Sequence, residues 1–168
     1  AELPDEAALV KQLGSWEADE ASEAVHQLWG LWYAERGPAA QTELIEGAEA
    51  MASAMNDRHA AEVARERFVG LIDRFPGWGE PLNKLATLEY LLGDYAGAAR
   101  LCHDTLAIKP HHFGALSGLV QCELARGDLE AAQNAAMRLH NLQPSFAADL
   151  LEDIRARRQG RRRGPGSY

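Results

Sequence analysis

Residues 79–112 read GEPLNKLATLEYLLGDYAGAARLCHDTLAIKPHH, and residues 113–146 directly after them read FGALSGLVQCELARGDLEAAQNAAMRLHNLQPSF. Both stretches have 34 residues, and superposing them aligns residues of the same kind. The aligned pairs are Leu82 and Leu116, Leu85 and Leu119, Gly93-Asp94 and Gly127-Asp128, Ala98 and Ala132, and Pro110 and Pro144. Pro76 stands one further period upstream and closes a weaker copy over residues 45–78. A fixed period of this length indicates a repeat protein.

Each copy predicts two helices joined by a tight turn. Apolar residues recur at helical spacing up to Gly93-Asp94, where a glycine can adopt positive φ and end the first helix. A second apolar stretch ends at Pro110, because proline cannot continue a helix. The small side chain of Ala98 lies where the two helices must approach closely. Such a hairpin cannot bury its apolar face alone, so neighbouring hairpins are expected to stack on it.

These residues resemble the tetratricopeptide repeat family. The copy at 79–112 matches at Leu85-Ala86, Tyr90, Gly93-Asp94-Tyr95, Ala98, Leu106 and Pro110, and the next copy at Leu119, Gly127-Asp128, Ala132 and Pro144. The first copy keeps Ala64, Phe68, Leu71 and Pro76, but it has Asn56-Asp57-Arg58-His59 where the family has Gly-Asp. The resemblance implies an all-α, right-handed stack of helical hairpins and a protein-binding function rather than an enzymatic one.

The 168 residues are enough for one domain with a continuous core. We predict two acidic N-terminal helices in residues 1–37, with the second helix at about 18–35. Three repeats follow in residues 38–146, as units 45–78, 79–112 and 113–146. The first repeat is expected to have helices at about 38–55 and 60–74. A capping helix over 147–158, beginning near Phe146, and a basic tail over 159–168 complete the division.

The second N-terminal helix carries one apolar stripe, formed by Val25, Leu28, Trp29 and Trp32. An open repeat stack must cover its end, so we expect the two tryptophans to pack against the first repeat as a cap. The alternatives are that this helix docks on a partner or folds back into the groove of the stack.

Charge is unevenly distributed, although the net charge is only −8. Residues 1–57 hold twelve acids against Lys11 and Arg36, whereas residues 155–168 hold six arginines and no acid. Nothing approaches the roughly 20 apolar residues that a membrane helix requires, so we predict a soluble protein. Cys102 and Cys122 fall on consecutive helices and are expected to be buried small apolar residues, with a disulfide as the alternative.

The leading helices of such a stack line a concave surface. We predict that a partner helix or an extended peptide binds there, because Gly114 and Gly118 leave the third row almost bare. The alternative is that these glycines only permit close helix packing. The predicted groove residues are Glu49 from the first unit, Asn83, Lys84, Thr87 and Tyr90 from the second, and Ser117, Gln121 and Leu124 from the third.

Several activities are not expected. Family members that hold the carboxylate of chaperone tails use lysine, asparagine and arginine from three leading helices, and here only Asn83 and Lys84 are present. His111 and His112 lack a metal-ligand spacing, so neither a metal nor a cofactor is predicted. The sequence also offers no nucleophile with a base, no phosphate loop and no paired carboxylates, so no catalytic residue is predicted.

The competing hypothesis is that the arginine-rich end of the chain is the binding surface. Arg157, Arg158, Arg161, Arg162 and Arg163 would contact nucleic acid or an anionic membrane surface, but the acidic body opposes this interaction. Alternatively, the tail or the N-terminal helices could join two copies of the chain. Overall we predict a scaffold or complex-assembly factor. Residues 28–33 and 112–118 resemble small tetratricopeptide proteins of bacteria and plastids, which implies a chloroplast or exported location after removal of a leader.

Overall fold

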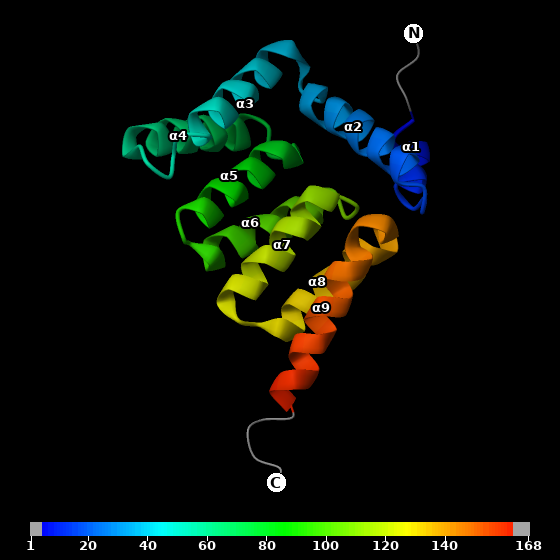
Figure 1. Cartoon of the computed structure of the whole chain (residues 1–168). Coiled ribbons are helices and arrows are strands. Elements are labelled where there is room, and N and C mark those ends of the chain that lie inside the picture. The colour runs from blue at the N-terminus through cyan, green and yellow to red at the C-terminus, as the bar shows by residue number, and fades with distance from the viewer. Residues whose placement is uncertain (1–4, 163–168) are drawn as a thin grey trace.

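The computed structural model describes residues 5–162, and this part of the chain folds into nine α-helices without strands (Figure 1). The fold is the predicted all-α arrangement of sequential hairpins. The helices are α1 Glu6–Leu13, α2 Ala18–Ala34, α3 Gly37–Met51, α4 Arg58–Arg74, α5 Gly79–Leu91, α6 Tyr95–Ile108, α7 Phe113–Arg126, α8 Leu129–Leu142 and α9 Pro144–Arg162. Consecutive helices pack together from α3 to α9, with α5, α7 and α9 in front of α6 and α8 in the view of Figure 1. None of the described helices is both long and apolar enough to cross a membrane.

The repeated Gly-Asp pair explains the turns within the second and third hairpins. Gly93 and Gly127 have φ values of 88° and 77°, which a residue with a side chain rarely adopts. The aspartates that follow cap the next helix: Asp94 accepts from the Gly97 N–H at 2.8 Å, and Asp128 accepts from the Ala131 N–H at 2.9 Å. The local sequence therefore ends one helix and begins the next.

The first hairpin turns without a Gly-Asp pair. Asp57 caps α4 by accepting from the backbone N–H of His59 at 2.9 Å, so α4 begins at Arg58 rather than near Ala60. The preceding helix ends at Met51, four residues before the expected end. Helix propensity favours a longer helix there, but the chain turns so that Ala54 can pack into the core.

The last helix is longer than expected. It begins at Pro144, whose fixed φ suits the first turn of a helix, and it continues to Arg162. Residues 159–162, which the sequence placed in a tail, are therefore helical. Ala147, Leu151 and Ile154 form its buried face against the rest of the stack.

The rings of Trp29 and Trp32 do not pack against the first repeat as expected, although α2 contacts that repeat through Tyr33 and through a hydrogen bond from the Trp78 indole to the Trp32 carbonyl. The Trp32 ring stacks on His112 with ring centroids 4.5 Å apart, and the Trp29 ring meets Phe113 edge-on at 5.1 Å. Both contacts are at the boundary between the second and third repeats, where His112 ends one unit and Phe113 begins the next. The reason is that His112 and Phe113 offer an aromatic surface of matching size between α5 and α7. As a result, α2 lies beside the N-terminal ends of α5 and α7 (Figure 1).

Candidate binding groove

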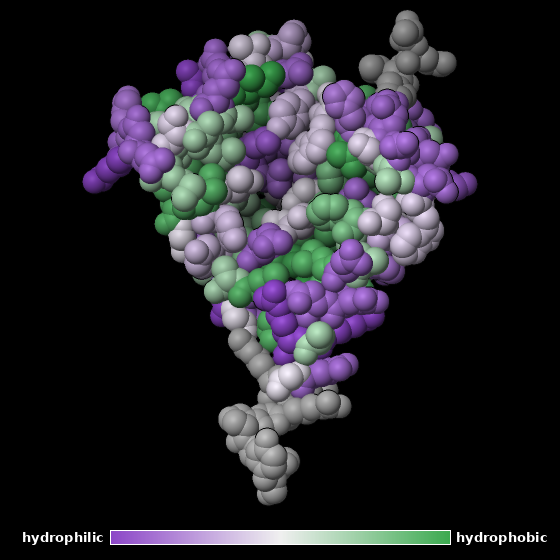
Figure 2. Space-filling model, viewed as in Figure 1, coloured by the Kyte–Doolittle hydropathy of each residue, from purple (hydrophilic) through white to green (hydrophobic). Residues whose placement is uncertain are grey.

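The face formed by the leading helices is hollowed between α5 and α7 (Figure 2). A pocket of about 190 Å³, here called the central pocket, lies in this hollow. Five of the eight predicted groove residues line it, together with Ala86 of α5, Cys102 of α6, and Gly118 and Cys122 of α7. The five predicted residues are Asn83, Thr87, Tyr90, Ser117 and Gln121.

The other three predicted groove residues do not line the central pocket. The Lys84 amine lies over the rings of Trp29 and Tyr33, at 5.5 Å and 5.2 Å from their centroids. Lys84 is thus engaged by α2 of its own chain through cation–π contacts. Glu49 is exposed on α3, and Leu124 is half-buried against the core.

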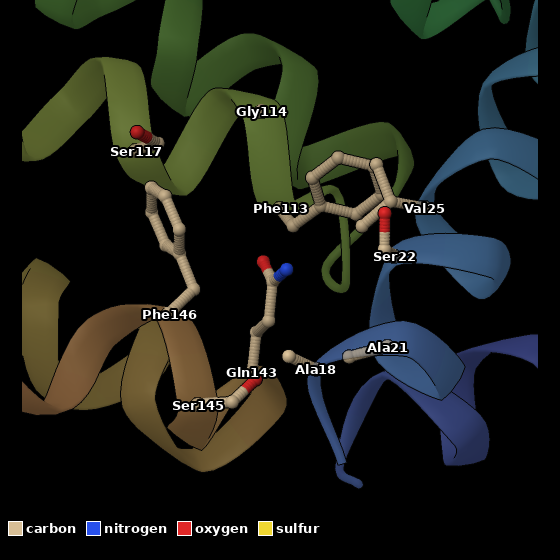
Figure 3. Close-up of a pocket in the computed structure, with 10 residues that line it drawn as sticks. All are labelled: Ala18, Ala21, Ser22, Val25, Phe113, Gly114, Ser117, Gln143, Ser145 and Phe146. Atoms are coloured by element: carbon tan, nitrogen blue, oxygen red, sulfur yellow. The ribbon is translucent and has the colours of Figure 1, made fainter. Parts of the chain in front are cut away.

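A second, larger pocket adjoins the first where α2 approaches α7 and α9. This pocket, here called the rim pocket, has a volume of about 450 Å³. Figure 3 shows Phe146 on one side and Phe113 with Val25 on the other, while the Gln143 amide points between them. Its remaining lining residues are Ala18, Ala21, Ser22, Gly114, Ser117 and Ser145.

Ser117 lines both pockets, so the two lie next to each other on α7. Sequence reasoning missed the rim pocket, because six of its ten lining residues come from α2 and α9, outside the leading helices of the repeats. No sequence signal marked it: Phe146 begins the apolar stripe predicted for the last helix, and only the structure shows that its side chain is 57% exposed. A large apolar side chain left open to solvent marks a contact surface when it edges a pocket.

The two glycines of α7 have different roles. A Cβ atom at Gly114 would lie 2.7 Å from the Trp29 ring, so this glycine makes room for a side chain of the same chain. At Gly114 the structure therefore agrees with the alternative from the sequence, in which the glycine permits close helix packing. Gly118 instead lines the central pocket, where a Cβ atom would lie 3.2 Å from the Cys102 sulfur.

A buried histidine holds the two groove helices in register. The Nδ1 atom of His112 accepts from the Ala115 N–H at 3.0 Å and caps α7. Its other ring nitrogen, Nε2, must therefore carry the proton, and it donates to Glu80 Oε1 at 2.7 Å. Both side chains are at most 1% exposed. This bond ties the beginning of α5 to the beginning of α7.

A second polar cluster fastens α1 to the turn between α6 and α7. Glu6 accepts from Lys109 at 2.9 Å and from the Trp32 indole at 3.0 Å, and it also bonds to His111 at 2.8 Å. Partial burial would raise the pKa of Glu6, but the hydrogen bonds from His111, Lys109 and Trp32 outweigh it and lower the pKa to about 2. Glu6 is therefore a carboxylate at neutral pH.

The histidines considered for metal binding face different partners: His111 contacts Glu6, whereas His112 contacts Glu80. Within residues 5–162, as far as their side chains are described, no three histidine, cysteine, aspartate or glutamate side chains come together as a metal site.

Two of the arginines predicted to contact nucleic acid or a membrane surface already interact with acidic residues of the chain. Arg157 forms an ion pair with Asp153 at 2.7 Å, and Arg158 lies 3.6 Å from Glu130. The side chains of Arg161 and Arg162 and the whole of Arg163 lie outside the described residues.

The hairpins, their capped turns and the pocketed face define a class: stacked helical-repeat proteins that bind through the leading helices. Residues 90–157 match the model of the tetratricopeptide repeat family. A 70-residue stretch is also 31% identical to a TPR repeat-containing protein of Rhizobium etli, covering 42% of this chain. Residues 90–157 therefore carry tetratricopeptide repeats, as the resemblance predicted. The chain covers 34% of the length of that relative.

Tetratricopeptide repeats generally bind other proteins and are typically non-catalytic, which agrees with the broad prediction from the sequence. The role in complex assembly, the chloroplast or exported location and the division of the chain into units stay predictions.

Proposed function

We propose that this chain is a non-catalytic scaffold that holds a segment of a partner protein in the groove formed by the central and rim pockets. The observation that carries the proposal is that Ser117 lines both pockets, which places them side by side on α7. A segment crossing α7 there meets small side chains only, and its backbone can approach the helix closely. As an assembly factor, the chain would hold such a segment while the partner joins its complex.

The chemistry of the lining suggests what the segment carries. The rim pocket is walled by Phe113, Phe146 and Val25, which suit one bulky apolar side chain. The central pocket offers the polar side chains of Thr87 and Gln121, which are exposed and can hydrogen-bond to a peptide backbone. We therefore expect an extended peptide with an apolar anchor at one end, because a whole helix would be wide for the central pocket.

The groove can be tested without knowing the natural partner. Peptides selected from a displayed random library against the wild-type chain should share a bulky apolar residue. Their affinity, measured by fluorescence anisotropy, should fall at least tenfold for Ser117→Trp, which fills the junction of the pockets and costs about 1.4 kcal/mol or more of binding free energy.

Ala125→Trp is the matched control, because Ala125 is exposed on the same helix and lines neither pocket. Peptides that bind Ser117→Trp as tightly as the wild type would show that the groove is not the binding surface. Both variants are checked for wild-type melting temperature first.

The alternative, binding of phosphate groups by the arginines of α9, receives less support. Arg157 and Arg158 already interact with acidic residues of the chain, so part of the positive charge is neutralised. Binding to single-stranded nucleic acid that weakens steeply between about 50 and 200 mM salt would favour this alternative.

A further inference from the structure

The two cysteines of the chain meet at the floor of the central pocket. Cys102 comes from α6 and Cys122 from α7, and each is 1% exposed. Both line the pocket and belong to one buried cluster, and a Cβ atom at Gly118, one helical turn before Cys122, would lie 3.2 Å from the Cys102 sulfur. They are free thiols in this structure. Cys102 faces the turn of α7 that runs from Gly118 to Cys122, since it lies close to both.

Gly118 lines the pocket beside the Cys102 sulfur. A Cβ atom there would lie only 3.2 Å from the Cys102 sulfur, so any larger residue would stand against the thiol. With glycine at this position, no side chain of that residue separates the sulfur from the pocket. A molecule of the size of a hydroperoxide fits easily within about 190 Å³.

The two thiols are chemically unequal. The hydrogen bond with Cys102 lowers the pKa of Cys122, which favours its thiolate form. The hydrogen bond with Cys122, together with burial, raises the pKa of Cys102. One sulfur is thus suited to attack an oxidant, and the other is held beside it as a thiol.

We propose that Cys102 and Cys122 form an oxidation site, in which a hydroperoxide converts the two thiols into a disulfide. The Cys122 thiolate attacks the peroxide, forms a sulfenic acid and releases hydroxide, or an alkoxide from an organic peroxide. The Cys102 sulfur then attacks the Cys122 sulfur, and water leaves with the proton of the Cys102 thiol. Two thiols are oxidised and one peroxide is reduced, so atoms and electrons balance.

This oxidation does not depend on partner binding, because disulfide formation requires only the chain and the oxidant. A failure of the peptide-binding proposal would leave it intact, and the reverse also holds. An exposed cysteine reacts with oxidants without any pocket. Here the neighbouring thiol and the space at Gly118 favour one product, the disulfide between Cys102 and Cys122.

The test starts from the reduced, folded, full chain treated with hydrogen peroxide. Remaining thiols are alkylated in denaturant, and the mass is measured. We expect both alkylation sites to be lost together, an intact mass lower by two hydrogens, and a cross-linked peptide that joins Cys102 to Cys122. Two thiols that stay alkylatable, or that are oxidised without a cross-link, would overturn the proposal.

Single variants separate the two roles. In Cys102→Ser, the Cys122 sulfenic acid has no thiol to condense with and should be trapped by dimedone. In Cys122→Ser, dimedone labelling should be weaker, since burial still raises the pKa of Cys102 when the Cys122 thiol is gone. Equal labelling of the two variants would contradict the assigned order of attack.

Gly118→Ala tests access through the groove and should slow disulfide formation several-fold. Gly70→Ala is the matched control, because a Cβ atom at this helical glycine meets nothing within 4 Å. Circular dichroism first confirms that both variants are folded. Equal oxidation rates in the two variants would show that the thiols are not reached through the pocket at Gly118.

Discussion

The first hairpin and the N-terminal helices are neighbours in sequence but belong to different cores. Ala40, Leu44, Phe68 and Trp78 form one buried cluster that α3 and α4 share with α5. Leu9, Leu13, Leu28 and Trp32 of the N-terminal helices instead join a cluster with residues of α6 to α9.

This difference shows that a flanking helix in a repeat stack packs where its large side chains find partners, and not on the nearest repeat. Here the partners are His112 and Phe113, roughly eighty residues away in the chain. The same packing makes α2 a wall of the rim pocket. Variants that destabilise the core of the N-terminal helices without changing the core of the first hairpin can test this separation.

The largest effect is expected for Trp32→Ala. The ring is 1% exposed, stacks on His112 and donates to Glu6, so its loss opens a cavity and removes a hydrogen bond. The free energy of unfolding should fall by about 3–5 kcal/mol in chemical denaturation. Trp16→Ala is the control, because Trp16 is 66% exposed, and it should change stability by less than about 0.5 kcal/mol. Similar losses in both variants would contradict the docking of α2.

His112→Ala should be the next most destabilising change, by about 3 kcal/mol. It removes the donor to buried Glu80 and the cap of the Ala115 N–H, and Glu80 Oε2 already has no hydrogen-bond partner among the described residues. The measurement is again denaturant unfolding, with the exposed His103→Ala as control. If His112→Ala unfolded like His103→Ala, the joint between α5 and α7 would not depend on this bond.

Gly114→Ala should cost about 1–3 kcal/mol, because its Cβ atom must displace the Trp29 ring. Gly30→Ala on α2 is the matched change, since a Cβ atom there meets nothing within 4 Å. Helix propensity alone predicts that Gly30→Ala stabilises the chain by up to about 1 kcal/mol. Near-ultraviolet circular dichroism should change for Gly114→Ala only; the same sign of stability change in both variants would argue against contact between α2 and α7.

The smallest effect concerns pH. The folded state holds the pKa of Glu6 at about 2, below its usual value of 4.5, so the carboxylate stabilises the fold above pH 4.5. This contribution is lost as the pH falls towards 2, because the group then becomes protonated in both states. The stability difference between the wild type and Glu6→Gln should therefore shrink over this range in urea unfolding. A difference that stayed constant with pH would show that Glu6 does not fasten α1 through its charge.

Much of the fold could be predicted, because its signals are local. Gly93-Asp94 and Gly127-Asp128 end and cap helices through their own backbone and side chains. Prediction failed at Met51 and beyond Arg158, where composition was the only guide and no single residue marks the end of a helix.

The site was predictable to the extent that it lies on the repeats. Asn83, Thr87 and Ser117 come together because the 34-residue frame places them on facing positions of successive leading helices. Lys84 was taken for a groove residue because the frame cannot show that Trp29 and Tyr33 cover it.

By itself, the sequence determined that the chain is a helical repeat protein with Gly-Asp turns, since periodicity and turn residues act within a few positions. Only the tertiary structure decided that α2 walls the groove and that Cys102 lies beside Cys122 at its floor. The physical reason is that these contacts depend on the shapes of surfaces assembled from distant segments. No pattern along the chain records how such surfaces fit together.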